Sequence, residues 1–134
     1  SLFPIQIPRI HICCLGLNCG MYNLVKVAAS PRKGVYKDYF TKKLPDEDPR
    51  FRVLESITDR YPPAYIVTAC HDFLREEAEP MYDFLKTKGI PVQMKCYGGE
   101  DRKDIGHVFH VNIPMREAIR CNDDTAEFFH TILK

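Results

Sequence analysis

The 134-residue sequence contains no tryptophan, no Cys-x-x-Cys pair and no apolar run close to the roughly 20 residues of a membrane-spanning helix. Without a Cys-x-x-Cys pair, zinc-ribbon and thioredoxin-like sites are excluded on spacing. A net charge of +1 gives no basic surface for nucleic acid or an anionic membrane. Residues 1–5 lack the charged start and longer apolar core of a signal peptide. We therefore expect no nucleic-acid partner, no membrane span and a cytoplasmic location.

Six cysteines are present, but their positions do not suggest a disulfide framework. Four of them fall in segments that we predict to be buried strands: Cys13, Cys14, Cys70 and Cys96. A free thiol in such a place behaves as a small hydrophobic side chain. This usage indicates a reducing compartment.

Three strand-like runs occur in the sequence, at residues 10–15, 64–69 and 92–97. Continuous apolar runs are typical of strands covered on both faces, as in parallel sheets, whereas the alternating third run fits a position nearer an edge. Helical periodicity occupies residues 76–88 and 124–133. The sequence predicts an α/β fold of about three parallel strands flanked by helices, in a single domain over residues 1–134.

The two helices carry different boundary signals. Apolar residues at helical spacing form one stripe in the first helix: Ala78, Met81, Tyr82 and Leu85. Gly89 suits the left-handed cap of that helix, whereas Pro80 conflicts with it unless it lies in the first turn. For the second helix we expect Asn122 or Asp123 as the cap, and three residues that face inward: Ala126, Phe129 and Leu133.

Residues 22–61 differ from the rest of the sequence. They contain Pro31, Pro45 and Pro49, mixed charges, and short helical patterns at 35–43 and 51–58. The segment is too long to be a plain loop in a compact domain. We expect a partial lid over the carboxyl edge of the sheet.

Asp72 follows the second strand, and His107 follows the third strand after a glycine-rich loop. The carboxyl ends of neighbouring parallel strands meet at one edge, where open α/β folds place their chemistry. A carboxylate that accepts a hydrogen bond from imidazole Nδ1 fixes the tautomer and leaves Nε2 as a general base. In the plainer alternative, Asp72 caps the helix that begins near Arg75 and His107 is an ordinary loop histidine.

Three further alternatives concern nearby residues. His110 is the rival base, although Val111-Asn112 favours its packing in the lid or core. His71, Asp72, His107 and His110 have suitable ligand types for zinc, but a carboxylate–imidazole pair explains the spacing without a metal. Cys19, in the Gly-rich segment 16–20, has the wrong offset for a nucleophile at a strand-to-helix elbow; we interpret it as part of a strand exit.

Residues 61–77 (YPPAYIVTACHDFLREE), 81–92 and 106–109 resemble the corresponding blocks of α/β-hydrolases in the hormone-sensitive-lipase-like esterase and lipase branch. The resemblance is strong from Pro62 to Phe109 and weak before Asp48. It implies the C-terminal half of an α/β-hydrolase fold, a serine hydrolase acting on small acyl esters, Asp72 as the triad acid and His107 as the triad base. It implies no cofactor and no metal.

The sequence departs from this family in two ways. None of its serines, at positions 1, 30 and 56, stands in a Gly-x-Ser-x-Gly pattern, and the charged loop 99–105 is longer than the usual turn before the histidine. We expect a truncated hydrolase without nucleophile elbow or oxyanion hole, inactive alone. The alternatives are a non-catalytic or degenerate interaction domain and a metal-dependent hydrolase using His107 and His110.

The strand predicted at residues 10–15 would lack the neighbour that it has in the resembled fold. An unpaired apolar edge is a template for adding another strand. We therefore expect a homo-oligomer, most simply a homodimer joined at residues 10–15 about a two-fold axis.

Overall fold

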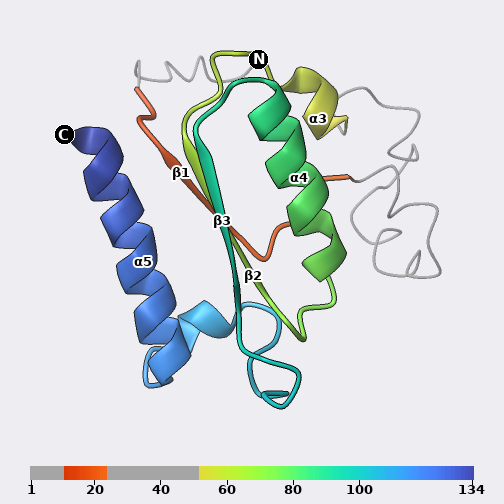
Figure 1. Cartoon of the computed structure of the whole chain (residues 1–134), viewed down its shortest axis with the longest axis vertical. Coiled ribbons are helices and arrows are strands. Elements are labelled where there is room, and N and C mark those ends of the chain that lie inside the picture. The colour runs from red at the N-terminus through yellow and green to blue at the C-terminus, as the bar shows by residue number, and fades with distance from the viewer. Residues whose placement is uncertain (1–10, 24–51) are drawn as a thin grey trace, which may run out of the picture.

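Figure 1 shows the computed structural model, which describes residues 11–23 and 52–134. Its strands are β1 (Leu15–Asn18), β2 (Ala64–Ala69) and β3 (Val92–Tyr97). Its α-helices are α3 (Val53–Ser56), α4 (Arg75–Thr87) and α5 (Arg116–Leu133), and a 3-10 helix, η2, spans Phe109–Val111. No helix within these residues is long and apolar enough to cross a membrane.

The strands form one parallel sheet in the order β1-β2-β3. All six residues of β2 are buried, because this central strand is paired on both sides and covered on both faces. The sequence therefore predicted the α/β class, the parallel pairing and the bounds of β2 and β3 correctly. Most of β3 is exposed or half-buried, in agreement with its alternating pattern.

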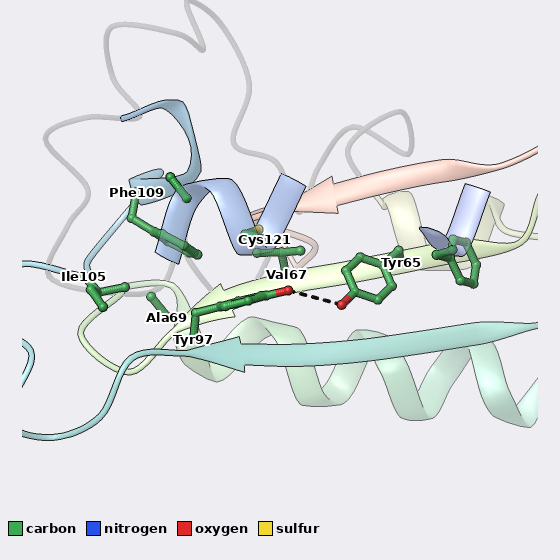
Figure 2. Packing of buried hydrophobic residues seen from close by; sticks show 9 residues of the cluster. Tyr65, Val67, Ala69, Tyr97, Ile105, Phe109 and Cys121 are labelled. Carbon is green, nitrogen blue, oxygen red and sulfur yellow. Dashed lines mark hydrogen bonds between the residues drawn. The ribbon is translucent and has the colours of Figure 1, made fainter. Parts of the chain in front are cut away.

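Helices α4 and α5 cover opposite faces of the sheet (Figure 1). Against α4, the fully buried Ile66, Met81 and Leu85 belong to one hydrophobic cluster. Against α5, Tyr65, Val67 and Phe128 belong to a second, which Figure 2 shows together with the 3.3 Å hydrogen bond between the Tyr65 and Tyr97 hydroxyls. Successive side chains of β2 therefore pack alternately into the two hydrophobic clusters on opposite faces of the sheet.

The first strand was predicted too early. It spans Leu15–Asn18 rather than residues 10–15, and Ile12 is 55% exposed. The Leu15 N–H donates to the Pro63 carbonyl, and Leu15 is in register with Ala64. Residues before Leu15 would face Pro62 and Pro63, which have no N–H to donate, so the pairing of β1 starts after them.

The α4 helix runs from Arg75 to Thr87, one residue earlier at each end than predicted, and it contains Pro80 beyond its first turn. Ala78, Met81 and Leu85 are buried as expected, and Tyr82 packs against the same cluster. Gly89 has φ of +73°, the left-handed conformation predicted for the end of this helix.

The α5 helix was predicted too short. It begins at Arg116, and the residues expected as caps, Asn122 and Asp123, are exposed positions within it. Its buried residues are Ala118, Cys121 and Phe128, whereas Ala126 and Leu133 are exposed. Short polar residues resemble a helix start in the sequence, but the apolar stripe of this helix begins a full turn earlier.

Residues 24–51 of the segment interpreted as a lid, with the helical pattern at 35–43, lie outside the described residues. Within residues 52–61 the structure has the short α3 helix, where a helical pattern was expected at 51–58. The lid and the single-domain assignment stay predictions.

The predicted burial of four cysteines is wrong. Cys13 and Cys96 are exposed, while Cys14 and Cys70 are half-buried. Of these, only Cys96 lies in a strand, and that strand is at an edge of the three-stranded sheet. The buried cysteines are Cys19 and Cys121, and all six are free thiols.

A polar network ties the sheet to α5. The Asp124 carboxylate accepts hydrogen bonds from the Lys95 ammonium and from the Tyr97 hydroxyl, the latter at 2.5 Å. Desolvation raises the pKa of Asp124, but the hydrogen bonds from Lys95 and Tyr97 outweigh it, so the pKa lies below its ordinary value. The charged carboxylate is therefore favoured by folding.

We expect Asp124→Asn to lower the free energy of unfolding near pH 7 by about 1 kcal/mol, because the partly exposed carboxylate loses charge-assisted hydrogen bonds. A depressed folded pKa gives stability that is present above the unfolded pKa of about 4 and is lost as the pH falls through the folded value. The difference between wild type and variant should shrink below about pH 4. Urea unfolding at several pH values measures it, with Asp123→Asn as the matched control; parallel curves would contradict the assignment.

Candidate active site

Asp72 lies in the turn between β2 and α4, three residues after the strand ends. Its N–H donates to the Ala69 carbonyl at 3.0 Å, and its Oδ1 accepts the Leu74 N–H at 2.9 Å. This local turn, typical of aspartate before a helix, holds the carboxylate in place. The side chain is fully buried at the carboxyl edge of the sheet.

His107 reaches the same edge from β3. The intervening loop turns at Gly98, which has φ of +81° and lies so close to Ile105 that an added Cβ would be 3.2 Å from that side chain. A parallel bridge then pairs Gly106 with His71, one residue before Asp72. This bridge sets His107 beside the turn that carries the carboxylate.

The Asp72 and His107 side chains form a hydrogen bond. Nδ1 of His107 lies 2.9 Å from Oδ1 of Asp72, and the imidazole side chain is 32% exposed. Because the ionised carboxylate only accepts, this geometry makes Nδ1 the protonated nitrogen and leaves Nε2 without its proton in the neutral ring. The proximity expected from the sequence is therefore present. We call this pair the Asp72–His107 dyad.

Thr68 and Cys19, which the sequence reasoning did not assign to the site, also lie beside the Asp72 carboxylate. The Thr68 hydroxyl lies 3.5 Å from Oδ2, and the Cys19 thiol lies within 4.8 Å of a carboxylate oxygen. A buried charge is stable only when donors satisfy it. Thr68 precedes Asp72 by four residues and points toward it from the end of β2, but the contact of Cys19 arises from β1–β2 pairing, which carries no local signal.

Cys19 is close to the dyad without having the properties of a nucleophile. It is 5% exposed, and burial together with the nearby Asp72 carboxylate raises its thiol pKa to about 12. A thiolate is the reactive form of cysteine, so this thiol stays protonated at neutral pH. The interpretation of Cys19 as part of a strand exit agrees with its place directly after β1.

Two non-glycine residues of the described ranges have positive φ, and both adjoin the dyad. Cys19 has φ of +49° and Val108, directly after His107, has φ of +52°. A β-branched residue in this region is an outlier, and such strain clusters at functional sites. Two strained segments thus meet beside the carboxylate.

One face of the imidazole is covered by an exposed aromatic ring. Phe73 is 54% exposed, and its ring centroid lies 4.3 Å from that of His107. Contact with this ring limits rotation of the imidazole, whose side chain remains partly exposed to solvent. Phe73 was another residue that the sequence analysis did not assign to the site.

The remaining histidines do not join the dyad. Nε2 of His71 lies 3.0 Å from the Glu100 carbonyl oxygen. His110 packs edge-on against Phe109, and burial followed by the nearby His107 lowers its pKa. His110 is half-buried rather than part of either hydrophobic cluster, and its Nδ1 is buried without a hydrogen-bond partner in the described residues.

The four-residue zinc set weighed from the sequence does not converge in the structure. Among the described residues, the group with the right spacing for a metal is Cys19, Asp72 and His107, whose ligand atoms lie within 4.8 Å of one another. A metal there would have to displace the proton of a thiol with a pKa of about 12 and break the Asp72–His107 hydrogen bond. The donor set therefore fits a carboxylate–imidazole pair better than a resident metal.

Comparison with protein-family models matches residues 26–111 to a family described as the alpha/beta hydrolase fold. The match spans more than half of the sequence and includes both residues of the dyad. The chain therefore belongs to the α/β-hydrolase family, and the resemblance noted from residues 61–109 is confirmed. No curated protein sequence gives a significant match.

Solved structures of esterases share the fold. Esterase B from Lactobacillus rhamnosis (HN001) aligns with a TM-score of 0.72 and 16% identity over 92% of this chain. The monoclinic form of the Pyrobaculum calidifontis esterase aligns with a TM-score of 0.67 and 21% identity over 87% of this chain. In both comparisons this chain spans 42% of the length of the other protein. The three parallel strands and their helices thus match a portion of an esterase fold.

Proposed function

We propose that this chain contributes the acid–base pair of a serine hydrolase that cleaves small carboxylic esters. The observation that supports this most is the 2.9 Å hydrogen bond between Asp72 and His107 at the carboxyl edge of adjacent parallel strands. Membership of the α/β-hydrolase family and the fold shared with two esterases point to the same chemistry.

In the proposed reaction, Nε2 of His107 takes a proton from a serine hydroxyl as that oxygen attacks the ester carbonyl. The imidazolium then returns the proton to the leaving alcohol, and a second cycle with water releases the acid. Asp72 stabilises the imidazolium and fixes the tautomer, while hydrogen bonds from Thr68 and Leu74 hold the carboxylate in place.

The sequence has no serine elbow that would supply the nucleophile of this mechanism. Ser56, the serine within the described ranges, lies on α3 and donates to the Arg52 carbonyl. No serine of the sequence has glycines two residues before and after it. The proposal therefore requires a serine elbow from a further polypeptide segment.

A non-catalytic interaction domain is the second candidate, and one contact favours it. Oδ1 of Asp72 accepts the Leu74 N–H just before α4, a structural role that would keep aspartate at this position without catalysis. Asparagine can keep that hydrogen bond through its own Oδ1 but carries no charge. Asp72→Asn thus separates the structural role from the catalytic one.

We expect Asp72→Asn to lower kcat for p-nitrophenyl acetate and butyrate by about 10⁴, because the imidazolium that forms during the reaction loses its negatively charged partner. His107→Ala should lower it at least as much. The assay uses the natural gene product that includes these residues, and circular dichroism checks that each variant folds.

His130→Ala, on the exposed side of α5, is the matched control and should leave kcat unchanged. Equal hydrolysis by wild type and both dyad variants would remove the catalytic role. Hydrolysis no faster than buffer for the wild-type protein would instead support the non-catalytic candidate.

The outer edge of β1 is the place at which we propose that a second copy adds. The strand lies at Leu15–Asn18 rather than at residues 10–15, and within the described ranges it pairs with β2 alone. An edge with unpaired backbone groups favours addition of another strand. Two copies related by a two-fold axis would satisfy both edges.

We expect Asn18→Pro to abolish such an assembly, because the N–H groups of Leu15 and Cys19 donate to β2 and the alternating Asn18 N–H therefore faces the outer edge, where proline removes it. Size-exclusion chromatography with light scattering measures it at high micromolar concentration. Wild type should elute as a dimer and the variant as a monomer of retained helicity; a wild-type monomer under these conditions would refute the proposal.

A further inference from the structure

Cys70 and Cys96 bring two thiols together away from the dyad. Cys70 follows β2 directly, and Cys96 is the penultimate residue of β3. The two Sγ atoms lie 3.6 Å apart. Cys96 is in register with Thr68, and the two-residue step from Thr68 to Cys70 keeps both thiols on the sheet face that α4 covers.

Backbone and side-chain hydrogen bonds hold this pair in place. The Cys70 N–H donates to the Tyr97 carbonyl at 3.0 Å, which extends the β2–β3 pairing by one residue. The Cys70 thiol donates to the Gly98 carbonyl at 3.3 Å. Because a thiol has one hydrogen, Cys96 is then the donor in the contact between the two sulfurs. The parallel register of β2 and β3 therefore brings the Cys70 and Cys96 thiols close together.

Both thiols are accessible, and their reactivity is moderate. Cys96 is exposed and Cys70 is half-buried. Desolvation of the thiol and its contact with Cys70 raise the pKa of Cys96 to about 11, against a smaller opposite effect of the Arg75 cation. Cys96 is thus a thiol at neutral pH, and its oxidation requires an added oxidant.

We propose that Cys70 and Cys96 are a redox pair that closes to an intramolecular disulfide with a small-molecule disulfide, such as oxidised glutathione, as the oxidant. One cysteine thiolate attacks the small disulfide, giving a mixed disulfide and releasing one thiolate. The second cysteine thiolate then attacks the protein sulfur of the mixed disulfide and releases the second small thiolate. The two protein thiols are oxidised, and one small disulfide is reduced to two thiols.

The geometry needs a modest movement. A disulfide bond is about 2.05 Å long, so the sulfurs must approach by about 1.5 Å from their present separation. Rotation of the two side chains and a small shift of the turn after β2 would supply this approach. The inference rests on the thiols alone and is independent of the proposed hydrolase activity.

Oxidised glutathione is added in excess to the reduced protein at low micromolar concentration, and the intact mass is measured without reductant. We expect a loss of about 2 Da, two hydrogen atoms, that dithiothreitol reverses. Trypsin cleaves after Arg60, Arg75, Lys95 and Arg102, so the expected product is peptide 61–75 linked to peptide 96–102, each of which contains one cysteine.

Cys96→Ser should abolish this linked peptide and leave glutathione attached at Cys70. Cys13→Ser, which removes another exposed thiol, is the matched control and should retain the linkage. Persistent separate glutathione adducts at Cys70 and Cys96 in wild type, or a linkage between other cysteines, would overturn the proposal.

Discussion

The parallel, in-register pairing of β2 with β3 is the constraint on which the site depends. It carries two chain segments that are 35 residues apart to one edge, and the additional bridge between His71 and Gly106 extends the alignment beyond the strands. The same register places Cys70 beside Cys96. One pattern of backbone hydrogen bonds thus produces both the dyad and the thiol pair.

A fully buried carboxylate is stable here because its donors come from three segments of the chain. Thr68 belongs to β2, Leu74 precedes α4 and His107 follows β3. Without such donors, desolvation would favour the neutral acid and weaken its hold on the imidazole. The left-handed backbone at Cys19 and Val108 shows that the chain accepts local strain on both sides of this carboxylate.

Patterns contained within one segment were predictable from the sequence, whereas those set by a neighbouring segment were not. A continuous run of apolar residues predicted β2, and alternating apolar and polar residues predicted β3. The start of β1 depends on Pro62 and Pro63 of the neighbouring segment. A prediction from the apolar run at residues 10–15 alone therefore placed the strand too early. In α5, Asn122 and Asp123 resembled a cap because nothing local shows that Ala118 packs against the sheet. The Asp72–His107 contact was predictable from strand order, but the contacts of Cys19 and Phe73 with it were not.

The tautomer of His107 tests most directly whether Asp72 controls the imidazole. A long-range proton–nitrogen NMR spectrum of the uniformly ¹⁵N-labelled chain distinguishes Nδ1–H from Nε2–H in the neutral ring. The 2.9 Å hydrogen bond predicts Nδ1–H for His107 in the wild-type chain, and Asp72→Ala, which removes the acceptor, should shift the ring toward Nε2–H. An Nε2–H tautomer in the wild-type chain, or an Nδ1–H tautomer unaltered by Asp72→Ala, would contradict it.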